Sequence, residues 1–122
     1  MKLHAHALSA RNTFTAYGEG WFAVNGERHE TGLIVFPDRM VDWPVAGFDA
    51  LRAEDFALLA DARPEIVLLG TGARQRFPHP RLTEALMQAR VGVEVMDTAA
   101  ACRTYNILMA EERLVAAALL VA

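Results

Sequence analysis

The stretch EIVLLGTGARQRFPHPRLTEALMQARVGVEVM, residues 65–96, decides the fold class. Ile66 to Leu69 is a continuous apolar run, which is typical of a strand covered on both faces. After the Gly-Thr-Gly loop, Pro80 lies in the first turn of a predicted helix, and residues 91–96 supply a second strand. The core-facing positions of that helix are predicted to be Leu82, Ala85, Leu86 and Ala89. A strand, a helix and a second strand form a right-handed crossover with parallel strands, so both strands end at the same edge of a sheet.

Upstream of this unit, residues 12–36 have the pattern of an antiparallel β-ribbon. Residues 13–17 alternate between polar and apolar, and Gly18 and Gly20 then interrupt the pattern. Asn25-Gly26 lies between two strand-like runs, which predicts a hairpin with a type I′ turn.

The segment that joins the ribbon to the crossover unit is predicted to be irregular at first and then helical. Residues 37–47, PDRMVDWPVAG, carry turn formers and two prolines, so we expect an irregular connection with a short extended piece around residues 41–45. Residues 53–64 predict a helix of roughly three turns that ends before Pro64. Its apolar face contains Phe56, Leu59 and Ala60.

The last third of the chain has two possible endings. Asp97 or Thr98 can cap a helix, but no glycine or proline follows, and the Ala- and Leu-rich sequence would let the helix continue. The alternative is a break near Glu112 to Leu114 and a buried strand LVAAALLV, residues 114–121. We favour the strand, because a helix that is apolar on every side would have no solvent face.

Composition indicates an ordinary globular protein. The 122 residues fit one domain, and 53% of them are hydrophobic while 22% are charged. A net charge of −3 argues against a nucleic-acid partner held by phosphate contacts. The N-terminus is a poor secretory signal, and no segment approaches the roughly 20 apolar residues of a membrane span, so we expect no stable membrane insertion and a cytoplasmic location.

The Gly-Thr-Gly loop is the strongest candidate for a ligand site. A P-loop is excluded because Gly72 is followed by Ala-Arg-Gln-Arg instead of Lys and a hydroxyl residue, and the dinucleotide fingerprint lacks its third glycine. A loop at the carboxyl end of a strand can still present amides to an anion, next to the N-terminus of the following helix. The candidate crevice contains Gly70, Thr71, Gly72, Arg74, Thr98 and Cys102. The alternative is that the two glycines serve only a tight turn.

The remaining chemical candidates predict no catalytic residue, no metal and no cofactor. Cys102 is the single cysteine, and no histidine pairs with it in the sequence, so we expect a buried and slowly reacting thiol. His4 and His6 would share a face of an extended segment, but no further Cys or His joins them. Asn106 lies on the same helix face as Thr98 and Cys102, and we expect its side chain to hydrogen-bond to backbone.

Two segments together resemble a known family. They are LLGTGARQRF, residues 68–77, and GVEVMDTAAACRTYNILMAEERLVAAAL, residues 92–119, with a Thr-x-x-Ala-x-x-Thr-x-Asn pattern at Thr98, Ala101, Thr104 and Asn106. The chain resembles the small Mth938-like single-domain family, which is related to a mitochondrial complex I assembly factor and an adipogenesis-associated protein. Relatives often have Glu-Gly-Arg where this chain has Glu111-Glu112-Arg113, so a left-handed helix stop would be strained and the turn is expected to be built differently.

The resemblance implies a three-layer α/β fold with a mixed central sheet, flanking helices and an N-terminal antiparallel β-ribbon, and it favours the strand for residues 114–121. It implies one Mth938-like domain over residues 1–122, in which we expect residues 1–11 to be flexible. The first function hypothesis is a non-catalytic assembly-type protein that binds other proteins. The alternative is a protein that binds a small molecule or anion, as an enzyme or otherwise, at Gly70-Thr71-Gly72. The identity of any partner and the oligomeric state stay open.

Overall fold

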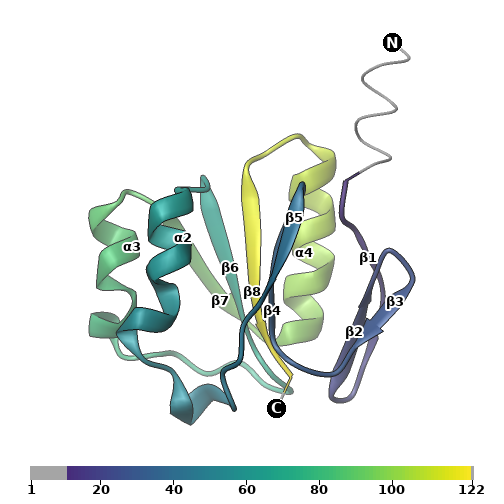
Figure 1. Cartoon of the computed structure of the whole chain (residues 1–122), viewed down its shortest axis with the longest axis horizontal. Coiled ribbons are helices and arrows are strands. Elements are labelled where there is room, and N and C mark those ends of the chain that lie inside the picture. The colour runs from purple at the N-terminus through teal and green to yellow at the C-terminus, as the bar shows by residue number, and fades with distance from the viewer. Residues whose placement is uncertain (1–10, 122) are drawn as a thin grey trace.

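A mixed sheet forms the centre of the molecule, with helices packed on it and a small β-ribbon beside it (Figure 1). The computed structural model describes residues 11–121. The strands are β1 Phe14–Gly18, β2 Trp21–Val24, β3 Glu27–His29, β4 Leu33–Phe36, β5 Arg39–Asp42, β6 Ile66–Thr71, β7 Gly92–Met96 and β8 Val115–Leu120. The α-helices are α2 Ala57–Ala62, α3 Glu84–Gln88 and α4 Thr98–Ala110, and short 3₁₀ segments span Phe48–Ala50, Ala53–Phe56 and Pro80–Thr83.

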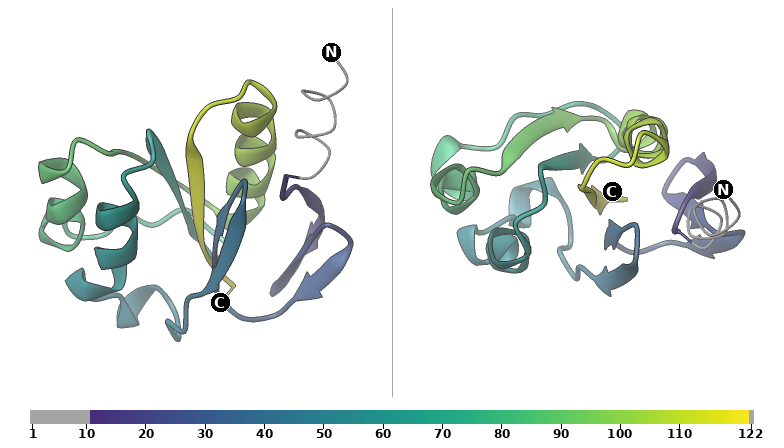
Figure 2. Two further views of the ribbon diagram at one scale, coloured as in Figure 1. Left: turned by 45° about the horizontal axis from the view of Figure 1, so that its top comes forward. Right: turned by 90° about the horizontal axis from the view of Figure 1, so that it is seen from above.

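The five-stranded sheet has the order β5-β4-β8-β6-β7, and the separate ribbon has the order β1-β2-β3. β6 pairs in parallel with both β7 and β8, whereas β4 pairs antiparallel with β5 and β8. The predicted parallel crossover from β6 through α3 to β7 is therefore confirmed. Figure 2 shows α2 and α3 on one face of the sheet and α4 with the ribbon on the other, so the expected layered α/β fold is confirmed as well.

Each face of the sheet has its own hydrophobic core. β8 supplies side chains to both cores and all six of its residues are buried, as expected for a strand covered on both faces. On the α4 side, Tyr105 packs edge to face against Phe14 of the ribbon at 5.1 Å between ring centroids. On the other side, Phe56 of the 3₁₀ segment Ala53–Phe56 and Leu59 of α2 are fully buried against the sheet. The strand predicted for residues 114–121 is therefore confirmed.

The ribbon turns where the sequence predicts. Asn25 and Gly26 both have positive φ, 53° and 84°, which is the backbone of a type I′ turn. The Asn25 side chain accepts from the backbone N–H of Thr13 at 3.0 Å and donates to the Asn12 side chain at 2.9 Å. These bonds hold the turn against the start of β1.

The prediction for residues 37–47 is wrong in position. Residues 39–42 form β5, which pairs with β4 across a tight turn at residues 37–38, so the extended piece lies earlier than residues 41–45. β5 is an edge strand with a mostly exposed sequence, and it therefore lacks the apolar alternation that marks a strand. The Arg39 guanidinium of β5 stacks over the Phe36 ring of β4, at 3.9 Å from the ring centroid.

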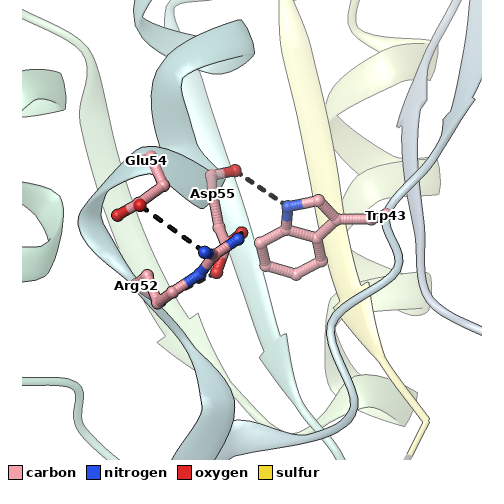
Figure 3. Close-up of polar contacts among 4 residues, drawn as sticks. All are labelled: Trp43, Arg52, Glu54 and Asp55. Carbon is pink, nitrogen blue, oxygen red and sulfur yellow. Dashed lines mark hydrogen bonds and ion pairs between the residues drawn. The ribbon is translucent and has the colours of Figure 1, made fainter.

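The segment after β5 is held by a buried tryptophan (Figure 3). The Trp43 indole N–H donates to the backbone oxygen of Asp55 at 2.8 Å, and its ring packs against Phe56. The Asp55 carboxylate accepts from the backbone N–H of Arg52 at 2.8 Å, and Arg52 also pairs with Glu54 at 3.5 Å. These contacts fix the start of the predicted helix, which is a 3₁₀ turn that continues as α2.

The predicted helix after Pro80 is present, but one of its predicted core positions is wrong. Leu86 is buried, whereas Ala85 is exposed. The first turn, Pro80–Thr83, is 3₁₀ and winds more tightly than an α-helix, so the core face does not keep the spacing assumed from the sequence.

The end of α4 corrects another expectation. Glu112 has a φ of 63°, so the left-handed stop is formed without glycine. The backbone N–H groups of Glu112 and Arg113 donate to the carbonyl oxygens of Met109 and Leu108 at 2.9 and 3.1 Å. This is the hydrogen-bond pattern of a Schellman motif, and it compensates the left-handed conformation at Glu112.

Three expectations are not tested by this structure. The pair His4 and His6 lies outside the described residues. The expected flexibility of residues 1–11 also falls outside them, except at Arg11. The domain boundaries 1–122 stay a prediction.

Candidate functional site

The Gly-Thr-Gly loop is packed tightly against the start of α4. Gly70 and Thr71 are the last residues of β6, and Gly72 turns the chain with a φ of 95°. A Cβ on Gly70 would lie 2.8 Å from the Leu119 side chain and 3.0 Å from the Thr98 Cα. Gly70 is therefore required by the close approach of α4, which is a structural role.

Thr98 joins the loop, the helix and the last strand. Its hydroxyl donates to the Leu120 carbonyl oxygen at 2.6 Å and accepts from the Gly72 N–H at 2.8 Å. Its own N–H donates to the Gly72 carbonyl oxygen at 2.9 Å. The backbone N–H groups of Gly72 and Thr98 therefore each already have a partner inside the protein.

Thr71 and Arg74 shape the loop from within. The Thr71 hydroxyl lies 2.7 Å from the Arg74 carbonyl oxygen and accepts from the Arg76 N–H at 3.1 Å. Thr71 is 2% exposed, whereas Arg74 is exposed. These contacts explain the loop's shape, and a ligand-binding role for its residues stays a prediction.

A cavity of about 240 Å³ lies between this loop and the turn that joins β1 to β2. Two of the predicted residues, Gly72 and Thr98, line it, but Gly70, Thr71 and Cys102 do not, and neither does Arg74. Asp97 also lines the cavity, and its carboxylate accepts from the Ala100 N–H at 2.8 Å as the cap of α4. The cap places a negative charge where the predicted anion would lie.

The prediction that Cys102 is buried is confirmed. The side chain is 0% exposed and belongs to the core on the α4 side of the sheet. Burial raises the pKa of the thiol to about 12, although the neighbouring Arg103 lowers it in part. The reactive thiolate is therefore disfavoured at neutral pH.

The predicted backbone contact of Asn106 is also confirmed. Its side-chain oxygen accepts from the Phe14 N–H at 2.9 Å, and its side-chain nitrogen donates to the Phe14 carbonyl oxygen at 2.8 Å. One side chain thus takes both hydrogen bonds of one β1 residue and joins the ribbon to α4.

Within residues 11–121, no group of three His, Cys, Asp or Glu side chains gathers in a way that could hold a metal ion. None of the helices described there is long and apolar enough to cross a membrane.

Sequence reasoning missed an apolar groove at the β7 edge of the sheet. Phe77 and Met87 are 73% and 71% exposed, and both line a cavity of about 330 Å³. The other lining residues are Pro78, Pro80, Thr83, Val91, Val93 and Val95. The sequence contained a signal for it, because Phe77 and Met87 are large apolar residues outside every predicted core face. The groove can accept the apolar side chains of another chain.

Comparisons with known proteins match most of this chain. A family model described as "Protein of unknown function (DUF498/DUF598)" matches residues 14–120. NADH dehydrogenase (ubiquinone) 1 alpha subcomplex assembly factor 3 of Bos taurus is 36% identical over 107 residues, which are 86% of this chain and 58% of the relative. The chain therefore spans less than two thirds of the length of that curated relative.

Solved structures share the fold of this chain. The crystal structure of a Bordetella parapertussis protein has a TM-score of 0.87 and 44% identity, over 93% of this chain and 98% of that one. The solution structure of a Mth938-like domain from Bordetella pertussis has a TM-score of 0.77 and 37% identity, over 93% of this chain and 86% of that one.

Proposed function

This chain belongs to the DUF498/DUF598 family, and from that premise we propose that it is a non-catalytic, assembly-type protein that acts by binding other proteins. The name of the bovine relative, an assembly factor, supports this role for the part of the relative that the chain spans. The observation that carries the proposal is the exposed apolar groove at the β7 edge.

The groove offers exposed apolar surface to a partner. Phe77 and Met87 lie mostly in solvent, and transferring such side chains from water to an apolar contact stabilises a complex by roughly 1.5–3 kcal/mol each. Val93 and Val95 are half-buried and form the wall on the sheet side. Clustered apolar side chains of this kind mark protein interaction sites more often than scattered ones do.

The backbone beside the groove is also available. β7 pairs only with β6, so among the described strands its outer edge has no partner. The Gln75 side chain donates to the Val95 carbonyl oxygen at 2.8 Å and covers one position of that edge. An extended partner segment could replace this side-chain bond with backbone hydrogen bonds and place apolar side chains in the groove.

The test compares a groove variant with a matched surface variant. The double variant Phe77→Ser with Met87→Ser removes the apolar groove, and Ile107→Ser removes a 59% exposed apolar side chain from α4, far from it. Each tagged protein is used to capture partners from cells of its source organism, and bound proteins are quantified by mass spectrometry. The proposal predicts partners that the groove variant loses and the Ile107→Ser variant keeps.

Two results would count against the proposal. Equal capture by both variants and the unchanged protein would show that the groove is not the contact surface. A groove that only joins two copies of this chain, seen as a change from dimer to monomer in light scattering with no captured partner, would do the same. Unchanged amide dispersion in NMR spectra checks that all variants are folded.

The proposal also includes a cytoplasmic location and partners that are proteins and not nucleic acid. The net charge of −3 supports the second point, because nucleic-acid affinity depends on neutralising phosphates. Cell fractionation followed by immunoblotting tests the location.

A further inference from the structure

A further pocket, lined by arginines, lies at the opposite end of the sheet from the Gly-Thr-Gly loop. Its volume is about 330 Å³. It lies where β4 ends and β8 begins. These strand ends are at the top of the view in Figure 1. Its charged lining residues are Arg11, Asp38, Arg39, Arg63 and Arg113. Four arginines thus line one cavity in a chain whose net charge is −3.

Two of these arginines have their charge offset by neighbours. Arg39 pairs with Asp38 at 3.4 Å, and Arg113 pairs with Glu65, which lies next to the pocket. Arg11 and Arg63 have no ion pair in the part of the chain that the structure describes, 11–121. The pocket therefore keeps a surplus of positive charge that an anion would neutralise.

The floor of the pocket is apolar. Phe36 and Val115 are 5% and 0% exposed, and Pro64 is buried. Leu114 is different, because it lines the same pocket and is 69% exposed. An apolar group bound in the pocket would remove the Leu114 side chain from water, which is favourable. A simple inorganic ion would leave the Leu114 side chain in water.

We propose that this pocket binds a small organic anion, in which a carboxylate or phosphate is attached to a short apolar body. The guanidinium group binds both anions through paired N–H donors. The volume lies at the lower end of the range of about 300–1,000 Å³ that is usual for small-molecule sites. The site is independent of the β7 groove, because no residue lines both.

The test uses four probes on the whole chain and follows backbone amides by NMR. Hexanoate and hexyl phosphate carry both features, hexylamine has the apolar body with the opposite charge, and inorganic phosphate has charge alone. We expect the two amphipathic anions to shift the amides of Arg39, Arg63, Leu114 and Val115 in a saturable way. The stronger of the two identifies the preferred head group. Inorganic phosphate should bind more weakly, and hexylamine should leave these amides unmoved.

Arginine variants distinguish binding in the pocket from attraction to the general surface charge. Arg11→Gln and Arg63→Gln each remove a cation that has no described ion pair, and each should raise the dissociation constant about threefold to tenfold. Arg90→Gln is the matched control, because Arg90 is an exposed arginine outside the pocket, and it should leave binding unchanged. Raising the salt concentration should weaken binding to the unchanged protein, because charge contacts near the surface are screened.

Three outcomes would overturn the inference. Equal shifts with hexylamine and hexanoate would show that charge plays no part. Unchanged affinity in the double variant Arg11→Gln with Arg63→Gln would exclude the arginines as ligands. Shifts confined to Gly72 and Thr98 would place the anion at the other end of the sheet. The capture experiment on the β7 groove is not affected by any of these results.

Discussion

Replacing Asn106 should weaken the attachment of the β-ribbon to α4. The Asn106 side chain makes two hydrogen bonds to Phe14, at 2.9 and 2.8 Å, and Phe14 is 6% exposed. Asn106→Ala leaves the N–H and the C=O of Phe14 without these partners. Leaving a buried polar group unpaired lowers the free energy of unfolding by about 1–3 kcal/mol. These two contacts are only partly buried, so the lower end of that range applies to each group. The two groups together should cost about 2–3 kcal/mol.

Helix propensity reduces that loss slightly. Alanine is a better helix former than asparagine by roughly 0.5 kcal/mol, so we expect a net destabilisation of about 2 kcal/mol. For a domain of this size the melting temperature should fall by roughly 8 °C or more. Calorimetry and urea unfolding measure the change, and Ile107→Ala, at the exposed neighbouring position, should stay within about 0.5 kcal/mol of the unchanged protein.

Hydrogen exchange then locates the effect. The Phe14 amide should exchange faster in Asn106→Ala than the global loss of stability explains, because its acceptor has been removed. A destabilisation no larger than that of Ile107→Ala, together with unchanged protection of Phe14, would refute the assignment of Asn106 as the link between ribbon and helix.

The structure makes three further predictions. Gly70→Ala should destabilise by about 1–3 kcal/mol in urea unfolding, because the new Cβ meets the Thr98 backbone at 3.0 Å, and a neutral result would contradict this close packing. Cys102 should react slowly with iodoacetamide when folded and quickly in urea. In the folded protein the pKa of the Cys102 thiol is raised to about 12, so the protonated thiol stabilises the fold. This stabilisation is lost as the pH rises above 9.0, the ordinary pKa of the thiol. The hydrogen bond from Arg113 lowers the pKa of Glu65. The ionised carboxylate therefore stabilises the fold at pH values above its ordinary pKa of 4.5. This stabilisation is lost as the pH falls through the lowered pKa of the folded protein. In an NMR titration Arg113→Gln should move the pKa of Glu65 upward, and an unmoved value would contradict the pairing.

The sequence predicts the elements whose signal is local. The continuous apolar run in β6, the Asn25-Gly26 turn and the Pro80 start each follow from the nearby residues alone. β5 lies earlier than the predicted extended piece, and the sequence does not mark it because an edge strand with exposed side chains has no apolar alternation. The left-handed stop at Glu112 does not follow from the sequence, because the Schellman hydrogen bonds that compensate it are visible only in three dimensions.

The candidate site shows more clearly what cannot be predicted from the sequence. The chain order correctly indicates that Gly72 and Thr98 meet at the end of the sheet, because parallel strands end at the same edge. It cannot indicate that they bond to each other and use up the amides expected for an anion. The β7 groove and the arginine pocket both combine residues from distant parts of the chain, so no motif marks either one.

The central claim is that this protein works through protein contacts at the β7 groove, and site-specific photo-crosslinking in living cells tests it most directly. A photoreactive phenylalanine analogue replaces Phe77 in one protein and Ile107 in another, since both side chains are mostly exposed. We predict discrete cross-linked products with another protein from position 77 and none of these products from position 107. The same products from both positions, or no product from position 77, would contradict the claim.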